Sequence, residues 1–237
     1  MASLAMDALL SRRGRADVLA FIQALSGSHR FVLDYLVEEV LDQQPAEVQE
    51  FLLKTSLLDR LSAPLCDAVV GGSDGESTLN WLERANLFVV PLDGERRWYR
   101  YHRLFADLLQ SRLQRTQPDL APVLHQRASL WCEQNGLQDE AIEHALAAPD
   151  FGRAATLIEA NAEAALMRSE VTIFLNWLDR LPDEQVHSSP ALCFYHAWAL
   201  LMSGGSLEEA EALLGRDRRA RWGSALNQVA EDRKSVV

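Results

Sequence analysis

The amino-acid sequence predicts a mainly α-helical protein, and three observations support this prediction. Apolar residues recur with the three-to-four-residue spacing of amphipathic helices along most of the 237 positions. Residues 87–101 change to an extended, aromatic-rich pattern around an Asp-Gly dipeptide. After Pro122, short segments of helical period follow one another through loops of a few residues. We therefore expect helices, then one β-hairpin, then antiparallel helix pairs.

Two helices are expected before Pro45, at residues 16–25 and 28–44. The first ends at Ser26-Gly27, where glycine suits a C-cap. The second ends before Pro45, because the residue preceding a proline resists the helical backbone. These helices form the first predicted region, residues 1–44.

Residues 45–121 form the second predicted region, with short helices around one hairpin. The expected helices are residues 47–57, 64–70, 77–85 and 104–113, and the expected strands are residues 87–90 and 97–101. Pro64 suits the first turn of its helix, where the missing N–H costs nothing. Asp93-Gly94 favours a two-residue hairpin turn. Three helices followed by a hairpin are typical of a winged helix.

Residues 122–215 are expected to form an α-solenoid of helix pairs. The predicted helices are residues 123–135, 137–147, 151–166, 172–181, 191–203 and 207–214. A repeat relates Trp131-x4-Gly136-x4-Ala141 to Leu200-x4-Gly205-x4-Ala210. Its glycines are 69 positions apart, close to two tetratricopeptide (TPR) periods of 34. Because residues 151–181 are less regular, we expect a TPR-like array.

Composition excludes several classes of function. The net charge of −11 argues against a dedicated nucleic-acid binder, which would present a basic face. The longest apolar run, residues 191–202, is too short to cross a membrane, and no signal peptide is visible. Cys66, Cys132 and Cys193 stand singly and are expected to be buried, reduced thiols of a cytoplasmic protein.

No catalytic or metal-binding motif is supported by its context. Neither Lys54 nor Lys234 follows a glycine, so the phosphate-binding loop G-x-x-x-x-G-K-[ST] is missing and we expect no enzyme activity from this chain. The segment Gly71-x-Ser73-x-Gly75 matches a nucleophile elbow, but that elbow needs an entering strand, and a helix is expected here. An ordinary inter-helix loop is the better interpretation. No Cys/His spacing indicates a metal site.

Residues 96–103 interleave four arginines with aromatic side chains. This pattern could bind nucleic acid by stacking and charge. Alternatively, it is a strand whose alternation puts Trp98, Arg100 and His102 on one face and Arg97, Tyr99 and Tyr101 on the other. One of the two aromatic sets would then pack inward, and the arginines would pair with acids. The expected third helix, 77–85, is not basic, because Glu83 offsets Arg84. We therefore expect no direct DNA binding by this segment.

Several strings together resemble one family. They are His29-Arg30-Phe31-Val32-Leu33-Asp34-Tyr35-Leu36, Phe51-Leu52-Leu53-Lys54-Thr55-Ser56, Leu82-Glu83-Arg84-Ala85-Asn86-Leu87-Phe88, residues 97–105 and residues 140–146. Over roughly residues 5–215 the sequence resembles the MalT-like, large ATP-dependent regulators of the LuxR class. That resemblance implies a STAND-type switch with an NTPase core, a winged helix, a helical sensor arm and a terminal helix-turn-helix. This chain would hold the middle, with residues 1–44 as a helical lid.

The resemblance also implies a nucleotide contact. In such switches a winged-helix histidine within a Met-His-Asp-type motif contacts the β-phosphate of ADP. His102 stands in a similar position, and Arg100 could add charge, although Tyr101-His102-Arg103 departs from the motif on both sides. The alternative is a histidine that caps local structure. The parent protein would use ATP and ADP, whereas this chain alone would hold no cofactor.

The ends of the chain suggest a fragment. Met1 falls inside the expected lid, and the resemblance fades after Gly215, which makes residues 216–237 an irregular tail. Residues 232–237 resemble the read-through of a sequencing adapter, with a natural frayed tail as the alternative. The expected partners are the parent's own NTPase core and an unknown inducer or protein ligand. We expect no membrane contact, and a parent that oligomerises when active. The rival hypothesis is a stand-alone TPR-type adaptor that docks other proteins.

Overall fold

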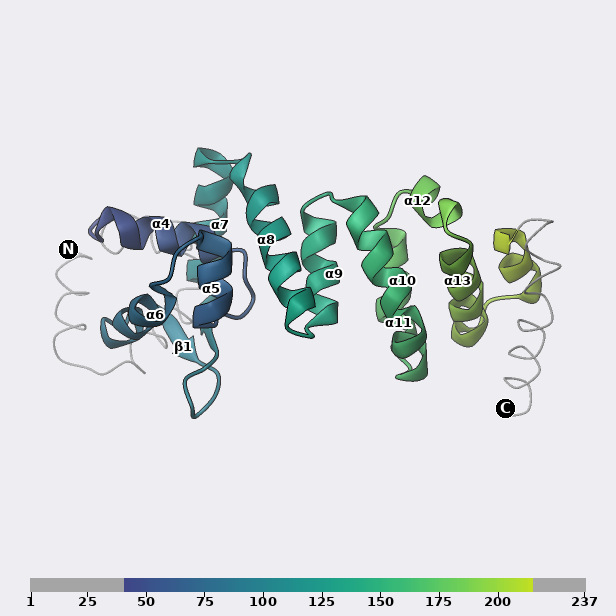
Figure 1. Cartoon of the computed structure of the whole chain (residues 1–237), viewed down its shortest axis with the longest axis horizontal. Coiled ribbons are helices and arrows are strands. Elements are labelled where there is room, and N and C mark those ends of the chain that lie inside the picture. The colour runs from purple at the N-terminus through teal and green to yellow at the C-terminus, as the bar shows by residue number, and fades with distance from the viewer. Residues whose placement is uncertain (1–40, 215–237) are drawn as a thin grey trace, which may run out of the picture. The chain divides into compact units, whose positions relative to one another are not determined.

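The computed structural model describes residues 41–214; the helices predicted before residue 41 and the tail predicted from residue 216 lie outside the described residues. Within the described part the chain is mainly α-helical with one antiparallel two-stranded sheet, which confirms the predicted fold class (Figure 1). Its elements are α4 (Ala46–Thr55), α5 (Ala63–Val70), α6 (Gly75–Arg84), β1 (Val89–Pro91), β2 (Tyr99–Tyr101), α7 (Arg103–Thr116), α8 (Leu120–Gln134), α9 (Gln138–Ala147), α10 (Phe151–Met167), α11 (Val171–Asp179), α12 (Asp183–Ser188) and α13 (Pro190–Ser203).

The described residues divide into two compact units. The first comprises residues 41–66 and 72–116, and the second comprises residues 67–71 and 117–214. In the first unit α7 supplies the centre of the core, because Phe105 and Leu109 are one helical turn apart and both fully buried. Leu52 of α4 and Leu82 of α6 are equally buried. The short helices therefore enclose α7 and the β-hairpin.

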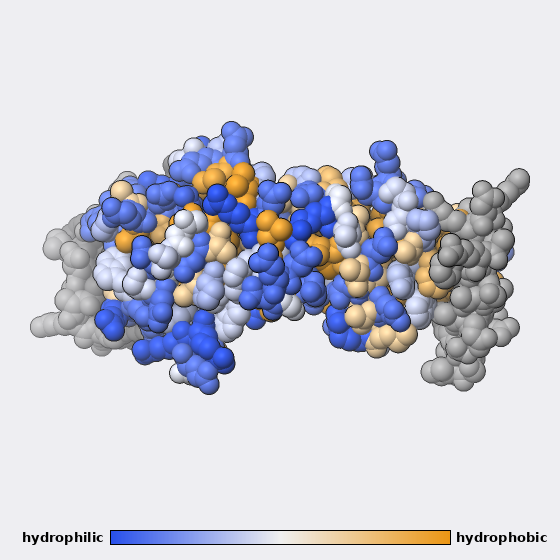
Figure 2. All heavy atoms as spheres, in the orientation of Figure 1, coloured by the Kyte–Doolittle hydropathy of each residue, from blue (hydrophilic) through white to orange (hydrophobic). Residues whose placement is uncertain are grey.

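The hairpin pairs Val89 with Tyr101 and Pro91 with Tyr99. Its connection is longer than the predicted two-residue turn, because the Leu92 N–H donates to the Trp98 carbonyl and leaves five residues inside that bond. Asp93 closes this loop, since its carboxylate accepts the Arg97 N–H at 2.9 Å. The surface of this connection is strongly hydrophilic (Figure 2). The Asp-Gly dipeptide thus predicted the position of the turn correctly, but the predicted length of the turn was wrong.

The second unit contains helix pairs. They are α8 with α9, α10 with α11, and α13 with a helix over residues 207–214. The six-residue helix α12 separates the second and third pairs and was not predicted. Buried alanines on α8, α9 and α10 let the backbones approach, and Phe174 and Trp177 of α11 fill the interior. Trp177 is therefore a packing residue.

Each helix pair turns through the same backbone geometry. One residue adopts a left-handed conformation, and the next N–H donates to a carbonyl five residues earlier, as in a Schellman cap. The left-handed residues are Gly136, Ser169 and Gly204, with φ values of 75°, 63° and 108°. The corresponding donors and acceptors are Leu137 to Cys132, Glu170 to Ala165, and Gly205 to Leu200. Gly136 and Gly204 are 68 positions apart, which is twice the 34-residue period.

This geometry corrects the predicted repeat. The sequence pattern aligns Gly136 with Gly205, but the residue equivalent to Gly136 is Gly204. Gly205 is constrained differently, because a Cβ there would lie 2.9 Å from the Leu200 carbonyl oxygen. The third turn is one residue longer, and Ser206 and Glu209 then form a capping box, each accepting the other's N–H.

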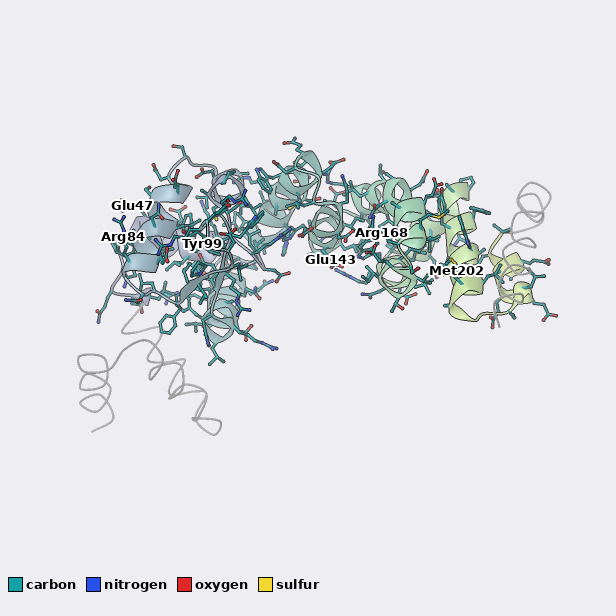
Figure 3. All side chains as sticks on the ribbon, turned by 90° about the horizontal axis from the view of Figure 1, so that it is seen from below. Glu47, Arg84, Tyr99, Glu143, Arg168 and Met202 are labelled. Atoms are coloured by element: carbon teal, nitrogen blue, oxygen red, sulfur yellow. The ribbon has the colours of Figure 1, made fainter. Side chains whose placement is uncertain are left out.

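Polar contacts join neighbouring helix pairs. Arg153 of α10 donates to Ser129 of α8 at 3.0 Å and forms an ion pair with Glu133 at 2.5 Å. Glu143 of α9, labelled in Figure 3, accepts the Trp177 indole N–H at 2.8 Å and pairs with Arg180 at 2.6 Å. These contacts fix the register between the first pair and the second.

Two further findings concern the cysteines and the length and hydropathy of the helices. All three cysteines are buried thiols outside any disulfide, as predicted. Among residues 41–214, no helix is both long enough and apolar enough to traverse a bilayer.

Candidate functional site

The candidate site lies at the end of β2, where a buried strand meets the start of α7. Tyr99 and Tyr101 are 3% and 5% exposed, whereas Arg100 between them is exposed. Of the two faces that the strand pattern distinguishes, the one with Tyr99 and Tyr101 therefore packs inward. Arg100 therefore emerges from a strand whose other face is fixed in the core.

Two contacts hold β2 in place. The Tyr101 hydroxyl lies 2.7 Å from Thr55 Oγ1, which itself donates to the Phe51 carbonyl on α4. The backbone of Tyr99 forms a reciprocal pair of hydrogen bonds with Leu61, at 2.7 and 2.8 Å. Sequence reasoning did not predict the Leu61 contact, because a single bridging residue carries no periodic signal.

His102 connects β2 to α7. Its N–H donates to the Phe88 carbonyl at 2.7 Å, and its own carbonyl accepts the N–H groups of Phe105 and Ala106. The backbone of His102 thus extends the hairpin and opens the helix at once. The alternative interpretation of His102 as a local capping residue agrees with these bonds, but they involve only the backbone and leave the imidazole's role open.

The electrostatics favour a neutral imidazole at His102. Partial burial lowers its pKa below the ordinary value, and the nearby Arg100 charge lowers the pKa further. Arg100 and Arg103 are exposed, and within residues 41–214 neither forms an ion pair. A neutral imidazole can donate one N–H, and two guanidinium groups beside a helix start attract negative charge. This arrangement is chemically suited to an anion such as phosphate.

Strained backbone borders His102. Phe88 has a φ of 56° and Asn86 a φ of 53°, both in the left-handed region. Asparagine tolerates this conformation, but a phenylalanine does so at a cost of about 1–3 kcal/mol. The Phe88 ring lies edge-on to the His102 ring, with their centroids 6.5 Å apart, and its centroid is 5.3 Å from that of Phe105. Asn86 could have been suspected from its residue type, whereas nothing in the sequence marks Phe88.

The remaining arginines of this segment are engaged. Arg96 pairs with Glu83 of α6 at 3.5 Å, and Arg97 pairs with Glu95 at 2.9 Å. The Tyr99 hydroxyl donates to Glu83 at 3.5 Å, and burial together with that carboxylate raises the Tyr99 pKa. Two of the four arginines thus pair with acids, as the strand interpretation predicted, whereas among residues 41–214 Arg100 and Arg103 do not.

The Gly71–Gly75 loop does not form a nucleophile elbow. The helix α5 enters it and the helix α6 leaves it, and Ser73 is an exposed loop residue. No strand presses the serine into the strained turn that an elbow requires.

The comparisons with known proteins identify the region around this site. A family described as the MalT winged helix domain matches residues 37–121. The serine/threonine-protein kinase PknK of Mycobacterium tuberculosis is 35% identical over 215 residues, covering 88% of this chain and 19% of the kinase. The HTH-type transcriptional regulator MalT of Klebsiella pneumoniae is 33% identical over 215 residues, covering 90% of this chain and 24% of the regulator. MalT of Serratia proteamaculans is 33% identical over 219 residues, covering 92% and 24%. The chain therefore spans about a fifth to a quarter of the length of these curated relatives.

Proposed function

Because this chain is MalT-like, with a winged-helix domain of the MalT family at residues 37–121, we propose that it is the regulatory segment of a signal-responsive transcription regulator. In this proposal the winged helix reads the nucleotide state of an NTPase core, and the helix pairs sense an inducer or a protein ligand. The segment itself neither hydrolyses ATP nor binds DNA. The parent protein supplies those activities and oligomerises when active.

The single observation that carries this proposal is that relatives with different named functions share this region. One is named as a protein kinase and the others as helix-turn-helix regulators, yet all align with nearly the whole of this chain. A region that occurs both in a protein kinase and in helix-turn-helix regulators serves a function that the two classes share. That is more simply a regulatory function than phosphoryl transfer or promoter recognition.

The proposed nucleotide contact uses His102 and Arg100 at the end of β2. His102 would donate its N–H to a phosphate oxygen of ADP, and Arg100 would add charge. The buried tyrosines on either side of Arg100 support this role, because they hold the strand rigidly while the guanidinium faces outward. The left-handed backbone of Phe88, whose carbonyl accepts the His102 N–H, supports the proposed nucleotide contact as well.

The helix pairs offer some support for the rival adaptor hypothesis. Met167 and Met202 each lie two residues before the left-handed residue of their turn, and they are 66% and 40% exposed. Exposed methionines at equivalent positions suit adaptable protein contacts. A docking surface is compatible with a sensor arm and with an adaptor, so the flanking gene sequence has to separate the two functions.

The first experiment extends the genomic locus on both sides of the region that encodes this chain. The regulator proposal expects an in-frame phosphate-binding loop upstream and a helix-turn-helix or another output domain downstream. A start codon at Met1 and a genuine stop after Val237 would overturn it and favour the adaptor.

The second experiment tests the nucleotide contact in the full-length parent by calorimetric titration of ADP. His102→Ala and Arg100→Ala are each expected to weaken ADP binding by about tenfold, the cost of losing one charge-assisted hydrogen bond. Arg97→Ala is the matched control, since Arg97 pairs with Glu95. Unchanged affinity and unchanged basal activity in both test variants would remove them from the site.

A further inference from the structure

Two histidines meet between the helices of the first pair. His125 of α8 and His144 of α9 approach each other with their Nδ1 atoms 2.9 Å apart and their ring centroids 5.2 Å apart. At this distance one Nδ1 carries a proton and donates it, while the other accepts with its lone pair. The contact joins two helices that pack closely along their length.

The charges around this pair are unevenly placed. Glu140 and Glu143 on α9 face His144 and favour its protonated form, but burial outweighs them and lowers the His144 pKa to about 4. From α11, Arg180 binds Glu143, and from α10, Arg168 lies 3.8 Å from Asp139 of α9. Of the two acids that favour protonation of His144, Glu143 is thus partly neutralised by Arg180.

The proton count decides whether the contact survives. A first added proton goes to the Nε2 of the donating ring, which carries no hydrogen in the neutral form, and leaves the Nδ1–H···Nδ1 bond intact. A second proton makes both rings imidazolium, so that two N–H groups face each other and no lone pair remains to accept. In the unfolded chain both rings take up protons near pH 6.5.

We propose that His125 and His144 form an acid-sensitive contact that holds α8 against α9 while they share one proton and releases it when both rings are protonated. The folded state binds fewer protons than the unfolded state between about pH 6.5 and pH 4. Stability is therefore full above pH 6.5 and falls as the pH decreases through this window. The proposal is independent of any nucleotide contact at His102.

Hydrogen exchange of the full chain, followed by mass spectrometry from pH 7.5 to pH 4.5, tests this contact. Protection factors corrected for intrinsic exchange are read over α8 and α9. Wild type is expected to lose protection, relative to His144→Gln and His125→Gln, by up to tenfold for each pH unit below about 6. His187→Gln, a change at an exposed histidine of α12, is the matched control and is expected to follow wild type.

An NMR titration of the wild-type imidazoles provides a second measurement that needs no variant. It is expected to find one of the two rings still neutral at pH 5, with its Nδ1 in a hydrogen bond. Parallel loss of protection in wild type and in both glutamine variants would overturn the proposal. So would ordinary titration of both rings near pH 6.5.

Discussion

The Tyr101 hydroxyl is buried within the first unit, and its only hydrogen bond among the described contacts is to Thr55. Thr55→Val leaves that hydroxyl unpaired, so we expect a loss of about 1–3 kcal/mol in the free energy of unfolding. Tyr101→Phe is expected to cost less, about 1 kcal/mol, because the Thr55 hydroxyl still donates to the Phe51 carbonyl. Urea denaturation of both variants and of the double variant measures the difference.

The control is Tyr99→Phe. The Tyr99 hydroxyl contacts Glu83 at a longer 3.5 Å, and Glu83 also pairs with Arg96. We expect a loss smaller than that of Tyr101→Phe. Equal losses at both tyrosines would contradict a specific contribution of the shorter Tyr101–Thr55 hydrogen bond.

The ionisation of His102 depends on its neighbour. Because the Arg100 charge contributes to the lowered pKa of His102, Arg100→Ala is expected to raise that pKa. It should still stay below the ordinary value, since partial burial is the larger cause. An NMR titration of the His102 ring checks both statements. Arg97→Ala should leave the pKa in place, and an equal shift in that variant would argue against a specific effect of Arg100.

At the scale of single residues, the sequence identified those whose role follows from alternation. Tyr99 and Tyr101 were predicted to share one face because a strand places every second side chain on the same face, but the pattern did not decide which face packs inward. The left-handed Phe88 and the contact between His125 and His144 could not be predicted. The first is imposed by tertiary packing against residue type, and the second joins positions on two helices that no spacing rule connects.

Among the secondary-structure elements, the three helix-pair turns differ in one informative way. Ser169 adopts the left-handed conformation that Gly136 and Gly204 adopt without strain. We expect Ser169→Gly to raise the free energy of unfolding by up to about 1 kcal/mol. Thermal unfolding followed by circular dichroism measures the change.

The converse variants are Gly136→Ala and Gly204→Ala. Each forces a Cβ into the left-handed region, so we expect losses of about 1 kcal/mol in the free energy of unfolding. Gly152→Ala is a control, because Gly152 lies in helix α10 with open space around it and should gain stability. Loss of stability in Ser169→Gly would contradict the equivalence of the three turns.

The elements themselves were largely predictable, for identifiable reasons. The long helices begin and end within a few residues of their predicted positions because their apolar spacing is sustained over several turns. The hairpin connection was predicted too short, since the bond from Arg97 N–H to Asp93 closes a larger loop. The helix α12 has six residues, too few to establish a period. The regular turn at Ser169 was hidden because its residue is not glycine.

At the scale of the whole chain, the net charge of −11 bears on DNA binding. The third helix of the winged helix, α6, carries Glu76 in its first turn, and its Glu83 contacts Arg96 and Tyr99. We therefore expect no retardation of a random duplex in a gel-shift assay at physiological salt. A shift that weakens steeply with added salt would contradict this expectation and would indicate a basic surface on the chain.

The left-handed serine between α10 and α11 has a consequence for the order of folding. A serine makes this turn harder to form in isolation than the glycine turns before and after it. Arg153 and Trp177 of the middle pair bind Ser129 and Glu143 of the first pair, and these contacts offset that penalty only after α8 and α9 are in place. The middle pair should therefore fold after the first pair and against it, so that folding proceeds along the chain from the first pair.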